Sequence, residues 1–169
     1  MFSQLLKLIP RTEFDDHSRR TDNGDYATQS GAPYGMFRRF IQGPAGLPCN
    51  HAPWGLLTAI DLDTGTIKWQ VPLGSLLGIA GSISIGGPIV TAGGVVFIAS
   101  TIDPFLRAFD VETGRELWKG ALPAPGHATP MTYQIQPNGR QFVVIAAGGH
   151  AKIDEERVSD ALVAFALPK

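Results

Sequence analysis

The chain has 169 residues, of which 44% are hydrophobic and 17% are charged, and its formal net charge is −1. Charged residues are scarcer than the roughly 25% usual for soluble domains, and 20 Gly and 13 Pro favour many short strands and tight turns over helices. A nearly neutral chain gives no electrostatic reason to bind nucleic acid, and no run reaches the 18 or more apolar residues of a membrane-spanning helix.

Residues 1–50 are expected to form an irregular, loop-rich segment with no alternating strand. Residues 15–35, DDHSRRTDNGDYATQSGAPYG, are polar and rich in turn formers, and residues 43–55 are rich in Pro and Gly. Cys49 is the only cysteine, so no disulfide can form within the chain. The start MFSQLLKLIPR has no small-residue cleavage site, which argues against a secretory signal.

An internal repeat is the most informative feature of the sequence. Residues 58–70 read TAIDLDTGTIKWQ and residues 107–119 read RAFDVETGRELWK, with five identities at a constant offset of 49 positions. Repeats of this length indicate solenoids, propellers or similar arrays. The matching residues are Ala59, Asp61, Thr64, Gly65 and Trp69 in the first copy and Ala108, Asp110, Thr113, Gly114 and Trp118 in the second.

Each copy of the repeat predicts a hairpin with a specified turn. A short strand runs into D-x-x-T-G and is followed by a second strand that contains the Trp. Asp and Thr side chains can accept hydrogen bonds from N–H groups of the turn, and Gly supplies a positive φ. The Trp side chains offer large apolar surfaces with one donor, which suits them to join one sheet to the next. We therefore expect these residues to be structural.

The remaining segments of residues 51–169 predict further strands, with Asn138-Gly139 as a hairpin turn. They lie at 88–91, 95–100, 130–135, 141–147 and 161–167. Residues 55–71 would give two strands of one blade, 88–119 all four of a second, and 130–167 three of a third. The sequence thus predicts an all-β fold, a partial β-propeller, with residues 51–169 as one complete and two partial blades. The open sheet edges are expected to pair with another strand or to aggregate.

Several runs resemble one protein family beyond the generic repeat. They include KLIPR (7–11), GAPYG (31–35), GLPCNHAPWG (46–55), GGPIVTAGGVVFIAS (86–100), HATPMTY (127–133) and QFVVIAAGGH (141–150). With A-x-D-x-x-T-G-x-x-x-W, they make the chain similar to the C-terminal part of membrane-bound dehydrogenases that depend on pyrroloquinoline quinone (PQQ) and oxidise glucose, quinate or shikimate.

The resemblance implies an eight-bladed propeller at the periplasmic face of the bacterial inner membrane, with PQQ and Ca²⁺ on its axis. It implies oxidation of a sugar or cyclic polyol and electron transfer to ubiquinone. The family's catalytic Asp and metal-binding Asn would precede Met1, so we expect no catalytic and no metal-binding residue in this chain. We also expect the chain to need a missing N-terminal propeller portion as its partner and to be inactive alone.

Four residues are the candidates for the cofactor pocket. Gly148, Gly149 and His150 follow an apolar strand, at a place where related quinoproteins approach PQQ. Glycine allows close backbone approach to a planar ligand, and His can donate to a carboxylate or quinone oxygen. The alternative is that these three residues simply begin an exposed loop. Trp54 could line the same cavity or pack between blades.

Other polar residues are expected to be structural more than functional. Asp103 is expected to cap its turn, and His127 to begin a strand. Lys7 and Arg11 are expected to be solvated or to bridge strands, without binding the cofactor's carboxylates. The acidic run of Asp154, Glu155 and Glu156 predicts a solvated loop.

A second hypothesis from a different class remains open: a non-enzymatic propeller-repeat module of the cell envelope that binds protein through its sheet edges. This hypothesis predicts that the chain forms a defined complex and binds no cofactor. If the chain is instead a part of an enzyme, we expect it to form polydisperse aggregates. HATPMTY and AAGGH exceed what blades alone require, which favours the dehydrogenase.

Overall fold

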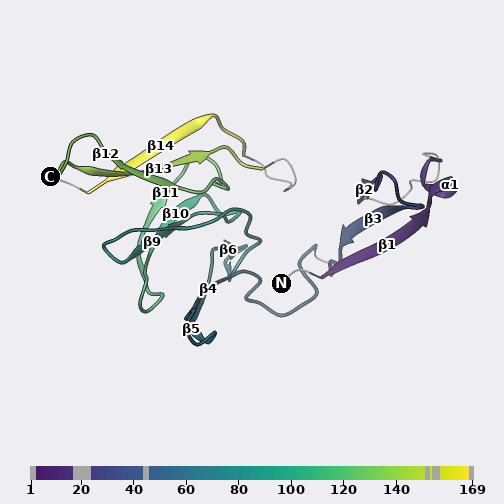
Figure 1. The fold of residues 1–169 in the computed structure, drawn as a ribbon, viewed down its shortest axis with the longest axis horizontal. Coiled ribbons are helices and arrows are strands. Elements are labelled where there is room, and N and C mark those ends of the chain that lie inside the picture. The colour runs from purple at the N-terminus through teal and green to yellow at the C-terminus, as the bar shows by residue number, and fades with distance from the viewer. Residues whose placement is uncertain (1–2, 17–23, 44–45, 151–152, 154–156, 168–169) are drawn as a thin grey trace. The chain divides into compact units, whose positions relative to one another are not determined.

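The computed structural model describes residues 3–16, 24–43, 46–150, 153 and 157–167. The chain divides into two compact units, residues 1–51 and 52–169, and both are built mainly from antiparallel strands (Figure 1). The all-β prediction is therefore confirmed. In the described ranges, no helix has the length and apolar character needed to cross a membrane.

The first unit contains a three-stranded antiparallel sheet in the order β1-β3-β2. The prediction that residues 1–50 hold no strand is therefore wrong. The polar, turn-rich composition of this segment gives no strand pattern. The strands also pair across a long connection: Gln4 lies opposite Phe40, and Pro10 lies opposite Tyr34. The elements are β1 (Gln4–Pro10), α1 (Arg11–Phe14), β2 (Asp25–Ala27) and β3 (Tyr34–Phe40).

Aromatic packing holds this small sheet together. The rings of Tyr26 and Phe37 lie 4.9 Å apart, and those of Phe14 and Tyr26 lie 6.2 Å apart. A Cβ on Gly35 would come within 2.2 Å of the Phe14 ring, so only Gly lets this ring lie against the strand. Arg11 Nη2 lies within hydrogen-bond distance of four main-chain carbonyl oxygens between residues 28 and 34 and shares its two hydrogens among them. Its guanidinium therefore organises the loop before β3, in keeping with the structural role expected of it.

The second unit contains three larger sheets and one short hairpin. The sheets have the orders β4-β5, β11-β10-β9-β8 and β12-β13-β14, and β6 and β7 form the hairpin, which the sequence had not revealed. The strands are β4 (Leu56–Ile60), β5 (Ile67–Pro72), β6 (Ser75–Leu76), β7 (Ile79–Ala80), β8 (Ile89–Val90), β9 (Val95–Ile98), β10 (Phe105–Asp110), β11 (Glu116–Ala121), β12 (Met131–Gln134), β13 (Gln141–Ala147) and β14 (Ala161–Ala166).

The two D-x-x-T-G turns have the predicted hydrogen bonds. Asp61 Oδ1 accepts the N–H groups of Asp63 and Thr64, both at 3.0 Å, and Gly65 has φ +69°. Asp110 Oδ1 accepts the corresponding N–H groups in the second copy. The backbone N–H of Thr64 lowers the pKa of Asp61 below its ordinary value, and the Thr113 hydroxyl does the same for the pKa of Asp110. Each carboxylate is thus kept ionised to close its turn.

Each repeat Trp contacts the next sheet, as the sequence predicts. Trp69 Nε1 donates to Val111 O at 2.9 Å, and the Trp118 ring lies edge-on to Phe165 with centroids 5.0 Å apart. Between the first and second sheets, Leu73, Val96, Ile98 and Phe109 form one core cluster. Between the second and third, Ala99, Leu106, Leu122, Val143, Ile145 and Ala147 form another. The three sheets are therefore stacked face to face in chain order (Figure 1).

Candidate functional site

Several loops of the second unit meet at one end of its sheets. These loops carry Ser100, His127 and His150. Because the strands are antiparallel, residues 99–104, 122–130 and 148–150 share the end opposite the D-x-x-T-G turns. Three backbone hydrogen bonds tie these loops and the segment before β8 together: Ile85 N–H to Ser100 O at 2.8 Å, Ser100 N–H to Gly126 O at 2.7 Å, and Gly149 N–H to Pro125 O at 2.9 Å. We call this region the loop-end cluster.

Two histidines come together in the loop-end cluster. The rings of His127 and His150 lie 5.9 Å apart in an edge-on arrangement. His127 is buried, and its Nδ1 lies 3.2 Å from Ile85 O. The sequence favoured a structural role for His127 and a site role for His150, and it gave no sign that the two would be neighbours.

Gly148 and Gly149 lead directly from β13 into the histidine contact. Gly149 has φ +72°, a conformation that favours Gly. A Cβ on Gly148 would lie 3.4 Å from Ser159 O, so the backbone is close to the start of β14. The two residues direct the chain from a buried strand to His150, which itself is partly exposed.

Trp54, the fourth candidate, lies just before β4 in a different set of contacts. Its side chain is buried, and a Cβ on Gly81 would come within 2.7 Å of the Trp54 backbone nitrogen. Gly81 has φ +82°, so the chain after β7 needs Gly at this close crossing. The backbone of Trp54 thus packs beside the β6–β7 hairpin, and the role of its side chain stays a prediction.

Ser100 and Gly86 form the most constrained part of the loop-end cluster. Ser100 is buried with φ +59°, and its hydroxyl has no hydrogen-bond partner among the residues that the structure describes. Gly86 has φ +123°, and a Cβ there would lie 2.3 Å from His127 O and 2.8 Å from Ser100 Oγ. Backbone strain and unpaired buried polar groups collect at functional sites. These two positions therefore make the loop-end cluster the candidate functional site of this unit.

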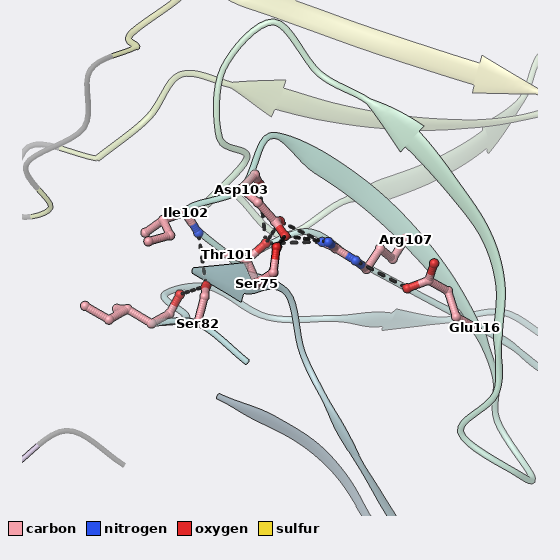
Figure 2. A network of polar contacts seen from close by, with 8 residues as sticks. Ser75, Ser82, Thr101, Ile102, Asp103, Arg107 and Glu116 are labelled. Carbon is pink, nitrogen blue, oxygen red and sulfur yellow. Dashed lines mark hydrogen bonds and ion pairs between the residues drawn. The ribbon is translucent and has the colours of Figure 1, made fainter. Parts of the chain in front are cut away.

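A buried ion pair supports the same end of the second sheet (Figure 2). Both nitrogens of the Arg107 fork contact Asp103, at 2.8 Å to Oδ1 and 2.6 Å to Oδ2. Asp103 also accepts the Thr101 hydroxyl at 2.6 Å and the backbone N–H of Ser75 at 2.8 Å. Arg107 Nε lies 3.3 Å from the Glu116 carboxylate. Asp103 thus bonds Thr101 of its own turn, and in addition it joins β10 to the β6–β7 hairpin through Arg107 and Ser75.

The electrostatics of Asp103 result from these contacts. Burial by itself raises the pKa of the Asp103 carboxyl group, but the hydrogen bonds from Arg107, Thr101 and Ser75 and the charge of Arg107 together hold it below its ordinary value. The side chains of Asp103 and Arg107 are only 11% and 6% exposed. Asp103 is therefore an ionised structural anchor.

Arg107 lies on a strand of the repeat, and the repeat pattern gives no sign of its buried ion pair. Arg107 is the charged residue in L-R-A-F, and Asp103, an opposite charge, stands four positions earlier. A buried charge needs a partner, so this spacing was the signal that could have revealed the pair.

The other residues singled out in the sequence add no further site. Cys49 is a free, exposed thiol, and Lys7 is an exposed residue of β1. Asp154, Glu155 and Glu156 lie outside the described residues. Within the described ranges, no three His, Cys, Asp or Glu side chains are grouped so that they could hold a metal ion.

Comparison with known proteins identifies the family. The model for the PQQ "glucose/ethanol/alcohol dehydrogenase, beta-propeller domain" matches residues 2–143, which is most of the chain. The chain belongs to the PQQ β-propeller dehydrogenase family. This confirms both the resemblance inferred from the sequence and the propeller type of the stacked sheets.

Members of the family match the chain along nearly its full length. It is 40% identical to the quinoprotein glucose dehydrogenase of Escherichia coli K12 over 97% of the chain. It is also 40% identical to the quinate/shikimate dehydrogenase (quinone) of Acinetobacter baylyi, over 100% of the chain. The chain spans only 22% of each of these relatives.

A solved structure of the family agrees with the fold. The quinohemoprotein alcohol dehydrogenase of Comamonas testosteroni is 25% identical to the chain and superposes with a TM-score of 0.58. The match covers 98% of the chain and 23% of that protein. The stacked sheets therefore correspond to a part of a larger PQQ-dependent propeller.

Proposed function

We propose that this chain forms the C-terminal blades of a PQQ-dependent dehydrogenase that oxidises a sugar or cyclic polyol. The observation that carries the proposal is the 40% identity over essentially the whole chain to dehydrogenases of glucose and of quinate or shikimate. Glucose is the first candidate substrate, and quinate or shikimate is the second. The name of the Acinetobacter relative, which specifies a quinone, supports ubiquinone as the electron acceptor. The proposal places the whole enzyme at the periplasmic face of the inner membrane.

The loop-end cluster has the donors that PQQ would require from this part of the protein. PQQ is planar and carries carboxylate and quinone oxygens, and when bound it accepts two electrons from the substrate as a hydride. His150 and His127 can supply imidazole donors to such oxygens, and Gly148 and Gly149 leave backbone exposed beside a flat ring. In the proposal, these residues bind and orient the cofactor from one side. Trp54 stays a weaker candidate for the same wall.

The described residues do not offer a binding site for Ca²⁺. Ca²⁺ takes six to eight oxygen ligands, mostly from carboxylates and carbonyl groups, and no suitable acidic group of three exists in the part of the chain that the structure covers. Asp103 is the most buried of the carboxylates discussed, and Arg107 already engages both of its oxygens. We therefore assign no metal ligand and no catalytic residue to this chain, and the proposal leaves both to the remainder of the enzyme.

Replacing His150 by Ala is expected to weaken PQQ binding by this chain at least about tenfold, because a hydrogen bond to a charged group contributes roughly 1.5–3 kcal/mol. Titration with PQQ, followed by quenching of tryptophan fluorescence, measures the dissociation constant. His51→Ala is the matched control, because His51 is exposed and lies in the other unit. Equal affinities of the two variants would remove His150 from the pocket, and no binding by the unaltered chain would contradict the proposed cofactor wall.

The chain alone is expected to show no dye-linked oxidation of glucose or quinate with PQQ and Ca²⁺ added. The physical reason is that it lacks an assigned base and an assigned metal site, which together lower the barrier to hydride transfer. Reduction of an artificial electron acceptor measures this directly, with a full-length family member as the positive control. Appreciable turnover would show that catalytic residues exist within these 169 positions.

A further inference from the structure

The tip of the β6–β7 hairpin is the feature that the proposed function leaves unexplained. Leu76 lies opposite Ile79, so Leu77 and Gly78 form a two-residue turn between the strands. Leu77 is 82% exposed and Ile79 is 38% exposed, and Ala80 is exposed beside them. We call residues 76–80 the hairpin tip. Its surface is apolar, although a turn of this length is normally polar.

The backbone of the hairpin tip is strained at Leu77. Its φ is +51°, and the φ of Gly78 is +79°. Two-residue turns of type I′ need positive φ at both positions, and Asn-Gly or Asp-Gly usually supplies it. Among the non-glycine residues with positive φ in the described ranges, only Leu77 is apolar. An exposed and strained Leu lowers stability, and conflicts of this kind gather at positions that function requires.

The base of the hairpin is anchored on the loop-end cluster (Figure 2). Asp103 accepts the backbone N–H of Ser75 at 2.8 Å and the Ser75 hydroxyl at 3.1 Å. The N–H of Gly81 donates to Gly74 O at 2.8 Å and closes the base. Asp103 lies in residues 99–104, which belong to the loop-end cluster. The hairpin tip is therefore carried by the same end of the sheets as His150.

The sequence around the hairpin carries no charge. Residues 69–102 contain no Asp, Glu, Lys, Arg or His, and Arg107 engages both carboxylate oxygens of Asp103 at the base. An anionic ligand needs cationic partners, and protein partners are commonly selected by complementary charges. This stretch of chain offers neither. A neutral apolar ligand needs no charged partner, and contact with Leu77 and Ile79 removes its surface and theirs from water.

We propose that the hairpin tip binds the aliphatic chain of a neutral quinone. The inference rests on the proposed function, in which a quinone is the electron acceptor. Leu76, Leu77 and Ile79 contact the aliphatic chain, and the anchored base holds the quinone beside the loop-end cluster. The strain at Leu77 then has a physical reason, because Asn or Gly would relax the turn but would remove the apolar contact. The hairpin tip binds and positions the quinone and takes no part in chemistry.

Decylubiquinone, a benzoquinone with a decyl chain, is the probe, and it is titrated into the full chain without PQQ. Quenching of tryptophan fluorescence measures the dissociation constant, since Trp54 lies beside the hairpin. In ¹⁵N-labelled chain, the amide signals of residues 75–80 should shift. The same quinone without its decyl chain should bind at least about tenfold more weakly, because it lacks the apolar surface that contacts the hairpin tip.

Leu77→Asn separates quinone binding from stability. Asn adopts positive φ readily, so the variant should melt about 2–4 °C higher than the unaltered chain. It should nevertheless bind decylubiquinone at least about fivefold more weakly, because the apolar side chain is gone. Leu62→Asn is the matched control: Leu62 is 92% exposed at the opposite end of the sheets, and its loss should leave the affinity within about twofold. Leu77→Gly, which also accepts positive φ, replaces Leu77→Asn if that variant fails to fold.

Three results would overturn the proposal. Equal affinities of the Leu77→Asn and Leu62→Asn variants would exclude the hairpin tip, and equal affinities for the two quinones would exclude the aliphatic contact. No saturable binding of decylubiquinone, with Leu77-dependent sedimentation on phosphatidylcholine vesicles or without it, would show that the tip serves a bilayer or nothing. A failure of PQQ binding counts against the cofactor wall alone, because the quinone titration contains no PQQ.

Discussion

Replacing Asp103 by Ala is expected to lower the free energy of unfolding by about 3–5 kcal/mol, the usual cost of removing one partner of a buried ion pair. The variant leaves the Arg107 charge buried, with only the partly exposed Glu116 carboxylate near it, at 3.3 Å. It also removes the acceptor of the Thr101 hydroxyl and of the Ser75 N–H. Urea unfolding followed by circular dichroism measures the change.

An exposed ion pair serves as the control that tests whether burial causes the loss of stability in Asp103→Ala. Lys68 and Glu112 join the first two sheets through exposed side chains, so Lys68→Met should cost less than about 1 kcal/mol. The double variant Asp103→Leu, Arg107→Met removes both charges and should recover much of the lost stability, because apolar residues of similar size can replace a buried pair. Equal losses for Asp103→Ala and Lys68→Met would contradict the buried-pair account.

The stability contributed by Asp103 should depend on pH with a defined sign. Because the folded protein holds the pKa of Asp103 below its ordinary value, the ionised carboxylate stabilises the folded state at every pH above that ordinary value, about 3.9. The stabilisation is lost as the pH falls from there through the lower pKa of the folded state. Asp103→Asn should therefore show a smaller loss of stability than the unaltered chain when the pH falls below about 4.

Gly86→Ala is expected to destabilise the second unit by about 2–4 kcal/mol, from backbone strain together with overpacking. The φ of +123° belongs to a region that residues with a side chain rarely adopt, and the new Cβ would lie 2.3 Å from His127 O. The loop that carries His127 must then move, and His127 must shift relative to His150. Unfolding experiments measure the first effect, and changes in the histidine ring signals in NMR spectra measure the second.

Two other glycines separate the effect of backbone strain from the effect of the clash. A Cβ on Gly87 would meet nothing closer than the Thr129 hydroxyl at 3.3 Å, so Gly87→Ala should cost less than about 1 kcal/mol. Gly78 has φ +79° with open space around it, so Gly78→Ala reports backbone strain without a clash, about 1 kcal/mol. A loss for Gly86→Ala no larger than that for Gly78→Ala would show that contact with the His127 loop is unimportant.

The loop-end cluster joins these expectations to the proposed function. Gly86, Ser100 and His127 lie within one set of short contacts, and Gly149 is tied to the loop that precedes His127. A change that relaxes the cluster should therefore alter PQQ binding even where no cofactor contact is removed. Asp103 supports the adjoining loop, so its loss should act on binding through stability.

The sequence by itself determined the longer strands and the turns of residues 52–169, with the β6–β7 hairpin as the exception. The alternation of side chains and the D-x-x-T-G turns act between residues close in the chain, so they can be read without a structure. The repeat also located Trp69 and Trp118 as contacts between sheets, and the family runs identified the dehydrogenase. Gly148, Gly149 and His150 were chosen by resemblance, and their role in cofactor binding stays a prediction.

Only the tertiary structure decided which distant residues meet. The strands β1 and β3 were invisible because their pairing partners lie across a long polar connection, and the hairpin β6–β7 is too short to give a pattern. The contacts of His127 with His150, of Asp103 with Ser75 and of Gly86 with His127 join separate loops. Such contacts depend on how whole sheets pack, and no local periodicity records them.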